Sequence, residues 1–329
     1  MRRFAGLFDL FPLFDWLYIT IEQARFSCGP RLVDPIERFA RMSIKIYMNG
    51  QLVDREDAKV SVFDHGFLYG DGIFEGIRLY NGKVFRAKKH MDRLWDSAKT
   101  LDIKIPISKE EMLDAIYKTC QANNFSDAYI RLIVTRGEGT LGLDANLCKD
   151  PQVIVIAQAL SLYSADFYEK GIKIVTASTI RNPSDSINPR VKSLNYLNNI
   201  MAKIEAYYAG CEEALMLNHK GDVCECTGDN IFIVKNGKLR TPPIDACILE
   251  GVTRNVVLEI CKELGLEASE TAFTRHDVYT ADECFLTGSA AELIPVVCVD
   301  GREIGDGKPG KITRTILSAF GDFVKKDDN

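Results

Sequence analysis

Lys192 is the residue whose setting first suggests chemistry. It lies in NPRVKSLNYLNNIMAKIEA, residues 188–206, just ahead of a stretch with helical periodicity. Most lysines in such places are solvated surface charges, but a buried lysine amine could instead bond covalently to a carbonyl group. Both interpretations are open at this point. The apolar residues that recur along the stretch predict one apolar helix face: Leu197, Ile200, Met201, Ile204 and Tyr208.

Two other segments have small residues where an anion could bind. In EGVTRNVVLEICKELG, Gly251 and Thr253 precede the apolar face of a predicted helix, and the free N–H groups of a helix start attract anions. A plain cap by Thr253 is the commoner explanation of such a pattern. In LTGSAAELIPV, Gly288, Ser289 and Ala290 form a second turn of small residues that could surround an anion. Neither segment is specific by itself.

Glu225 lies in GDVCECTGDNIFIV, a predicted strand region with apolar flanks. If it is buried, it needs a cation or hydrogen-bond donors, because an unpaired buried carboxylate is costly. An exposed glutamate on an edge strand is the alternative, and the segment alone favours that alternative slightly. A lysine for a Schiff base, a carboxylate for a pyridinium nitrogen and two phosphate-binding turns are what pyridoxal 5′-phosphate needs. Together these residues suggest that cofactor.

The elements that would position these residues are strands with tight turns and interspersed helices. Asn-Gly pairs stand between apolar runs in IYMNGQLV, IRLYNGKVFRA and NIFIVKNGKLRTP, and they are typical of two-residue hairpins. Ser108 and Glu111 form a capping box before another helix. Without strict βαβ alternation, the pattern predicts an α+β fold. We expect a smaller N-terminal α/β domain at 42–160, a linker at 161–171 and a larger C-terminal domain at 172–329.

Composition limits the function classes. The 329 residues carry a net charge of −5 with acids and bases interspersed, and no basic patch is interleaved with aromatic residues, so a nucleic-acid partner is not expected. The ten cysteines are scattered and suggest reduced thiols in a cytoplasm. The four histidines lie far apart without ligand partners at zinc spacing, so no metal site is predicted.

Residues 1–41 differ from the rest of the chain. Their apolar run is interrupted by Asp9, Pro12 and Asp15, which makes it a poor membrane span, and no membrane association is expected. Our hypothesis is that residues 1–41 are a dispensable extension of uncertain status. The rival is a peripheral membrane or partner-binding segment.

Seven motifs, in order, resemble those of the class IV aminotransferases, the fold type IV pyridoxal phosphate enzymes. The resemblance is closest to the branched-chain amino acid aminotransferases and covers about residues 42–322. It implies a two-domain fold like that of the D-amino acid aminotransferases, with the cofactor between the domains, and a homodimer or higher homo-oligomer. The motifs are FDHGFLYGDGIFEGIRLYNG, HMDRL, AYIRLIV, KSLNYLNNIMAKIEA, ECTGDNIFIV, LEGVTRN and LTGSAAELIPV.

The resemblance implies a role for each matching residue. Lys192 would hold the cofactor as a Schiff base, Tyr196 would bond its phenolic oxygen, and Glu225 would pair with its ring nitrogen. Some relatives have one more residue between the lysine and the tyrosine. The residues that match phosphate contacts are Arg93, Val252, Thr253 and Ser289.

The resemblance also implies the substrates, which are small amino acids and 2-oxo acids. The enzyme would transfer the amino group of L-leucine, L-isoleucine or L-valine to 2-oxoglutarate. Arg131 would receive the glutamate side-chain carboxylate, and backbone N–H groups at Ser289 and Ala290 would take the α-carboxylate. The positions that match Tyr69 and Leu143 reach over from the partner subunit in relatives. The apolar walls would be Tyr69, Phe74, Tyr129 and Leu143.

Two alternatives remain open from the sequence. A D-amino acid aminotransferase or an aminodeoxychorismate lyase would share the fold and the lysine. The D-specific relatives carry an arginine and a histidine in the loop after AYIRLIV. Here the loop reads TRGEGTLGLDANL and lacks that pair beyond Arg136, which favours the branched-chain interpretation. A non-catalytic binding protein is the second alternative, and an intact Lys192 and Glu225 argue against it.

Overall fold

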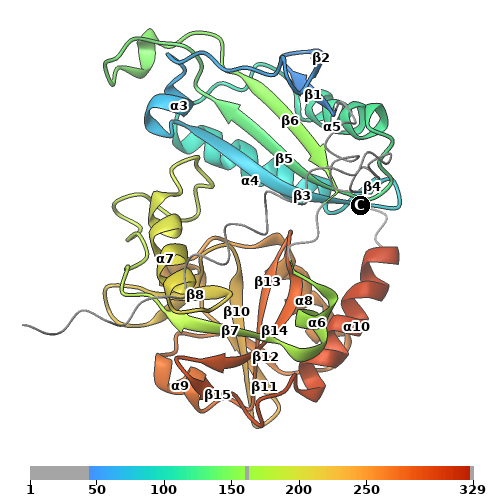
Figure 1. The fold of residues 1–329 in the computed structure, drawn as a ribbon, viewed down its shortest axis with the longest axis vertical. Helices are drawn as coiled ribbons and strands as arrows, with labels where there is room; N and C mark the ends of the chain where they lie inside the picture. Colours follow the sequence, from blue (N-terminus) through green and yellow to red (C-terminus); the bar gives the residue numbers. More distant parts are fainter. Residues whose placement is uncertain (1–43, 160–162, 327–329) are drawn as a thin grey trace, which may run out of the picture. The chain divides into compact units, whose positions relative to one another are not determined.

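The computed structural model describes residues 44–159 and 163–326 (Figure 1). The prediction for residues 1–41 therefore lies outside the described residues. The linker prediction at 161–171 lies outside them for residues 161 and 162. Among the described residues, no helix combines the length and the apolar composition that a membrane crossing requires.

An antiparallel sheet of six strands organises the first part of the described chain, in the order β2-β1-β6-β5-β3-β4. The long strand β3 pairs along its length with β5. The elements of this part are β1 (Lys45–Met48), β2 (Gln51–Asp54), α3 (His65–Tyr69), β3 (Gly72–Tyr80), β4 (Lys83–Val84), α4 (Ala87–Thr100), α5 (Lys109–Ala122), β5 (Ala128–Thr135), the 3-10 helix η1 (Ala145–Leu147) and β6 (Val153–Gln158).

The predicted Asn-Gly turns are confirmed. Asn81 and Gly82 join β3 to β4 with φ angles of 48° and 77°, the left-handed conformation that a two-residue hairpin turn requires. Asn49–Gly50 and Asn236–Gly237 have the same pair of positive φ angles. The turn chemistry of the sequence thus sets the strand register locally.

Helices α4 and α5 pack against the six-stranded sheet through an apolar core (Figure 1). The predicted capping box starts α5, with the Ser108 hydroxyl accepting from the Glu111 N–H and the Glu111 carboxylate accepting from the Ser108 N–H. In α4, Met91, Leu94 and Ala98 face the core at helical spacing. These contacts fix α4 against β3, and α4 also carries Arg93.

A second, mixed sheet organises the rest of the described chain, in the order β12-β11-β10-β13-β14-β7-β8-β9, with β15 paired to β14. Its parallel pairs are β11–β12, β14–β7 and β7–β8. The elements are α6 (Ala165–Lys170), β7 (Ile172–Thr176), α7 (Leu197–Tyr208), β8 (Glu213–Leu217), β9 (Val223–Cys226), β10 (Asn230–Lys235), β11 (Lys238–Thr241), the 3-10 helix η2 (Ile244–Ala246), α8 (Val252–Glu263), β12 (Ala268–Glu270), α9 (Arg275–Tyr279), β13 (Glu283–Gly288), β14 (Glu292–Val299), β15 (Arg302–Glu303) and α10 (Lys311–Lys326).

Helix α7 exists as predicted, but its larger apolar residues point away from the core. Its buried residues are Asn199, Ala202 and Ala206, and the two alanines join a core cluster with Ala214 and Met216 of β8. Small side chains allow the helix to approach the strand closely, so the bulkier row faces outward. The exposed apolar side chains of α7 are Leu197, Ile200, Met201, Ile204, Tyr207 and Tyr208.

The described part contains a short helix, α6, within the predicted linker, and it packs against β14. The strands of the first sheet lie within 45–158 and those of the second within 172–303. The proposed domain limits at 42–160, 161–171 and 172–329 stay a prediction.

Candidate active site

Strand β3 positions the loop that carries Lys192. The Lys192 carbonyl accepts from the Phe74 N–H at 2.9 Å, and the Gly72 carbonyl accepts from the Leu194 N–H at 2.9 Å. The Lys192 N–H donates to the Ser97 hydroxyl of α4 at 3.2 Å. The lysine backbone is therefore bonded on both sides to the strand and helix of the first sheet.

The Lys192 amine lies among aromatic side chains. Its Nζ is 4.7 Å from the centroid of the Phe74 ring and 3.3 Å from the Tyr196 hydroxyl. The Phe74 and Tyr196 rings meet edge to face at 4.9 Å. Tyr196 is the last residue before α7, so the helix start fixes where its ring lies. This setting differs from that of a solvated surface lysine.

Glu225 is buried, which excludes the exposed-strand alternative. It is 4% exposed and lies in β9. Its carboxylate accepts from Arg181 Nε at 2.9 Å, from the Leu249 N–H at 3.0 Å and from Asn230 Nδ2 at 3.1 Å. Burial raises the pKa of Glu225 above its ordinary value, although Arg181 acts in the opposite direction.

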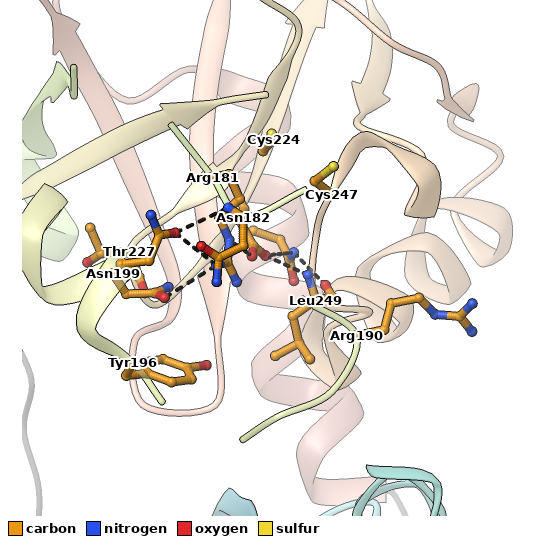
Figure 2. Close-up of polar contacts among 12 residues, drawn as sticks. Arg181, Asn182, Arg190, Tyr196, Asn199, Cys224, Thr227, Cys247 and Leu249 are labelled. Carbon is orange, nitrogen blue, oxygen red and sulfur yellow. Dashed lines mark hydrogen bonds and ion pairs between the residues drawn. The ribbon is translucent and has the colours of Figure 1, made fainter. Parts of the chain in front are cut away.

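Arg181 is a site residue that sequence reasoning missed. Its Nη1 donates to Asn198 Oδ1 at 3.2 Å and to Asn199 Oδ1 at 3.3 Å, and its own backbone N–H donates to the Leu217 carbonyl. Figure 2 shows Arg181 at the centre of these polar contacts, with Asn199 on one side and Leu249 on the other. Arg181 and Glu225 are 44 positions apart, so no local spacing could signal the pair.

At the start of α8, the backbone of Gly251 lies close to the side chain of Asn230. Gly251 is the N-cap, and a Cβ there would lie 2.0 Å from Asn230 Oδ1. The same asparagine donates to Glu225 and to the Leu249 carbonyl, so one side chain joins the helix start to the buried carboxylate. Thr253 is buried within the first turn rather than at the cap, which excludes the plain N-cap explanation.

The residues predicted to contact a phosphate gather around this helix start. Arg93 and Val252 line one cavity of about 470 Å³. Thr253 and Ser289, together with His90 of α4, surround a separate narrow gap. The structure thus brings together side chains from α4, α8 and the turn after β13.

Arg93 contacts a carboxylate that the sequence interpretation overlooked. Its Nε and Nη2 each donate to Glu75 at 2.7 Å, and its Nη1 donates to the Glu250 carbonyl at 2.8 Å. Glu75 also accepts from His90 Nδ1 at 2.8 Å. A signal was available in GIFEGIRL, because alternation places Glu75 in the same row as the apolar Ile73 and Ile77.

Arg131 and Tyr129 lie on one side of β5, as expected for residues two positions apart in a strand. Arg131 Nη2 lies 3.4 Å from the Tyr129 hydroxyl, and its guanidinium lies 4.4 Å from the Phe74 ring centroid. The opposing residue on β3 is Gly76, where a Cβ would come within 2.3 Å of the Tyr129 hydroxyl. Among the described residues, the buried Nε of Arg131 has no hydrogen-bond acceptor.

Tyr69 and Leu143 are not brought to this cluster. Leu143 is 81% exposed, and the partly exposed Tyr69 donates its hydroxyl to the Leu141 carbonyl. In the described part of the chain, no hydrogen bond or ring contact joins either residue to Phe74 or Arg131. Ala290 lies half-buried in the turn between β13 and β14.

The comparison with known families decides the classification. The sequence profile of the family "Amino-transferase class IV" matches residues 72–299, which include every predicted site residue except Tyr69. The chain belongs to the class IV amino-transferases.

Several relatives of this class IV amino-transferase are similar over most of their length. A Methanocaldococcus jannaschii protein, named provisionally as a branched-chain-amino-acid aminotransferase, is 55% identical over 283 residues, or 86% of this chain and 97% of its own. The solved Escherichia coli branched-chain amino acid aminotransferase has a TM-score of 0.84 at 36% identity, covering 87% of this chain and 97% of its own. The solved T.th. branched-chain amino acid aminotransferase contains pyridoxamine 5′-phosphate and has a TM-score of 0.82 at 36% identity, covering 86% and 94%.

These findings confirm the resemblance, the α+β fold type IV architecture and the class of enzyme. Class IV amino-transferases are pyridoxal phosphate enzymes, and the predicted cofactor is confirmed at this level. The T.th. enzyme has also been solved with N-(5′-phosphopyridoxyl)-L-glutamate and with 4-methylvaleric acid. Within residues 44–159 and 163–326, no group of three histidine, cysteine or acidic residues is arranged to hold a metal ion.

The residues of this amino-transferase fit the cofactor chemically. The amine of Lys192, the buried Glu225 carboxylate and the donors around Val252 and Thr253 are the groups that an aldehyde, a ring nitrogen and a phosphate require. The Arg131 Nε without an acceptor among the described residues is a place for a further carboxylate. Each individual role is a proposal.

Proposed function

We propose that this protein transfers the amino group of L-leucine, L-isoleucine or L-valine to 2-oxoglutarate, reversibly, giving the branched 2-oxo acid and L-glutamate. The observation that carries the proposal is that one aromatic ring contacts both reactive groups. Phe74 has the Lys192 amine 4.7 Å from its centroid and the Arg131 guanidinium 4.4 Å from it. The amine proposed as nucleophile and the guanidinium proposed as carboxylate receptor thus contact the same aromatic ring.

Pyridoxal 5′-phosphate would bond covalently to Lys192. When bound, it supplies an electrophilic carbon for the substrate amine and a ring that takes up the electron pair released at Cα. Glu225 would hold the ring nitrogen, and Tyr196 would donate to the phenolic oxygen. Arg93, Val252, Thr253 and Ser289 would bind the phosphate, because α8 presents its free N–H groups beside them.

Lys192 would also move the proton. With its amine free, Lys192 Nζ would take the proton from the substrate Cα and return it to the C4′ carbon of the cofactor. Its backbone bonds to Phe74 and Ser97 keep the loop in place during this exchange. Tyr196, 3.3 Å from Nζ, would hold the amine at the correct side of the ring.

Dual substrate recognition is supported by the surroundings of Arg131. Its side chain lies over Phe74 and beside Tyr129, so aromatic walls and a cation share one space. A branched side chain would contact the rings, whereas the distal carboxylate of glutamate would pair with the guanidinium. Backbone N–H groups at Ser289 and Ala290 would take the α-carboxylate. The two T.th. complexes with a glutamate derivative and a branched acid are consistent with this division.

We also propose that the active unit is a homodimer. Large apolar side chains are exposed on α7 and around α3 and η1, and such side chains are unusual on a monomer surface. Tyr69 and Leu143 would complete the substrate pocket of a partner subunit. The cytoplasmic location stays a prediction. The exposed apolar side chains around α3 and η1 are Val62, Phe63, Phe67, Tyr69, Leu141, Leu143 and Leu147.

The test compares wild-type protein with Lys192→Ala. Wild type with pyridoxal 5′-phosphate should show a visible chromophore that borohydride bleaches, and Lys192→Ala should lack it and have no turnover. Single-turnover assays with L-leucine, L-valine, D-alanine and aminodeoxychorismate should show reaction with the two L-amino acids alone. Substantial transamination by Lys192→Ala without an added amine, or a preference for D-alanine, would refute the proposal.

A further inference from the structure

Glu75 is a carboxylate in an apolar row. In β3, alternate residues face α4, and Ile73, Ile77 and Leu79 of that row belong to the core cluster. Glu75 stands between them and is 0% exposed. Burying a carboxylate is costly unless cations and donors surround it, and a buried ion pair is rarely a source of stability compared with apolar packing. Its place in this row therefore calls for a reason other than folding.

Two side chains of α4 surround this carboxylate. Arg93 approaches it side-on, with Nε on one carboxylate oxygen and Nη2 on the other, both at 2.7 Å. His90, 1% exposed, donates from Nδ1 to the second oxygen at 2.8 Å. Burial lowers the pKa of His90 below its ordinary value. Burial alone would raise the pKa of Glu75, but Arg93 and His90 outweigh it and lower that pKa. The pair is thus a carboxylate and a guanidinium joined by two hydrogen bonds.

Some N–H groups of Arg93 have no acceptor among the described residues. A guanidinium has five N–H groups, one on Nε and two on each terminal nitrogen. Glu75 accepts two of them, and the Glu250 carbonyl accepts one from Nη1 at 2.8 Å. No further acceptor for Arg93 lies among the residues that the structure describes. One N–H on Nη1 and one on Nη2 remain, and both can donate to an added anion.

The contacts of Arg93 place its guanidinium beside the start of α8. Glu250 immediately precedes Gly251, the N-cap of α8, so the bond to its carbonyl ties Arg93 to the start of that helix. Arg93 and Val252 line the same cavity. His90 lines a narrow gap together with Thr253 and Ser289. Glu75, His90 and Arg93 therefore connect the core of the first sheet to the phosphate-binding turns.

We propose that Glu75, supported by His90, is a positioning residue for the cofactor phosphate: it holds Arg93 side-on so that the remaining two N–H groups face the start of α8. This inference rests on the proposed function, since it assumes that pyridoxal 5′-phosphate binds there. Glu75 itself would not contact the phosphate, because two negatively charged groups repel each other. It acts only through the orientation of Arg93.

The experiment measures cofactor binding to the apoprotein with and without the phosphate group. Wild type and Glu75→Gln are titrated with pyridoxal 5′-phosphate and with pyridoxal, following the visible chromophore. Losing a hydrogen bond to a charged group weakens binding about 10-fold to 150-fold, and we expect Glu75→Gln to lose affinity for the phosphorylated form within that range. Affinity for pyridoxal should stay within about 2-fold, because the change acts through Arg93 on the phosphate alone.

A matched control and a cycle of variants keep the test decisive. Glu283→Gln removes another glutamate that is hydrogen-bonded at the start of a helix, here α10, and should change neither affinity. Arg93→Met and Glu75→Met are made as single variants and together as a double variant. The double variant buries no unpaired charge and should fold even where Glu75→Gln does not. It should bind pyridoxal 5′-phosphate as Arg93→Met does, because Glu75 has nothing left to position.

Two results would overturn the inference. The first is that Glu75→Gln loses equal affinity for pyridoxal and for pyridoxal 5′-phosphate. The second is that the double variant loses as much affinity for pyridoxal 5′-phosphate as the sum of the losses of Arg93→Met and Glu75→Met. Failure of wild type to form any chromophore with either aldehyde would instead refute the proposed function, and so the two failures are distinguishable.

Discussion

Glu75 and Glu225 are both buried carboxylates that contact an arginine, yet their electrostatic balance is opposite. Glu75 receives two N–H groups of Arg93 and one of His90, and these partners outweigh burial and lower its pKa. Glu225 receives a single N–H of Arg181 and two neutral donors, and burial raises its pKa. Each carboxylate pairs with one arginine, but only at Glu75 do the partners outweigh the effect of burial on the carboxyl pKa.

This difference indicates what each region can still bind. A buried carboxylate whose pKa stays raised beside its arginine is stabilised by an added cation, such as a protonated ring nitrogen. A carboxylate whose pKa its partners already lower gains less from an added cation, but it can fix the orientation of its arginine. Arg131 adds a third case, because its buried Nε has no acceptor among the described residues and it can therefore receive an anion. Variants of these residues test the contrast, from the largest expected effect to the smallest.

Arg181→Met should destabilise the apoprotein most. It leaves Glu225 buried without its cation, and breaking a buried pair in this way costs about 3 to 5 kcal/mol of unfolding free energy. Urea unfolding followed by circular dichroism measures the change. The double variant Arg181→Met with Glu225→Met is the control and should recover most of the loss. A single variant as stable as wild type would mean that Glu225 is protonated in the apoprotein and needs no cation.

Glu225→Gln should slow catalysis while the cofactor stays bound. A neutral amide cannot hold a protonated ring nitrogen, and electrostatic losses of this kind reduce kcat about 100-fold to 1000-fold. The measurement is steady-state kcat at saturating pyridoxal 5′-phosphate. Glu75→Gln is the matched control, because excess cofactor should restore its kcat. Recovery of Glu225→Gln under the same excess would remove the distinction between the two carboxylates.

Arg131→Leu should separate the two half-reactions. The distal carboxylate of glutamate loses its charged partner, at about 1.5 to 3 kcal/mol, or 10-fold to 150-fold, whereas leucine has no such group. Single-turnover rates with L-glutamate and L-leucine measure both directly. Equal losses would mean that Arg131 supports the fold or the cofactor, and a loss confined to leucine would reverse the proposed orientation of the pocket.

The pH dependence of stability should have opposite signs for the two carboxylates. The folded pKa of Glu75 lies below the ordinary 4.5, so its contribution to stability is present above pH 4.5 and is lost as the pH falls below it. The folded pKa of Glu225 lies above 4.5, so its contribution is present below pH 4.5 and is lost as the pH rises past it.

Urea unfolding of the apoproteins from about pH 3.5 to 7, taken in steps, measures these contributions against a reference carboxyl pKa near 4. Glu225→Gln should gain stability relative to wild type as the pH rises, by about 1.4 kcal/mol for each unit of pKa shift. Glu75→Gln should lose less stability than wild type on acidification. Parallel curves for all three proteins would contradict the opposite assignments.

The sequence by itself determined the features that depend on near neighbours along the chain. Asn-Gly pairs require positive φ angles and so specified the hairpin turns, and Ser108 with Glu111 specified the start of α5. Alternation along β5 placed Tyr129 and Arg131 on one side. The motif around Lys192, read with the others in order, was enough to predict the family that the comparisons confirm.

Only the tertiary structure decided which charges meet and which faces are covered. Arg181 reaches Glu225 across 44 positions, and Glu75 meets Arg93 because α4 packs on β3. The outward orientation of the apolar row of α7 depends on how closely Ala202 and Ala206 approach β8. Periodicity shows that a helix has two faces, but burial and pKa depend on what the fold brings against each face, and that information is not local.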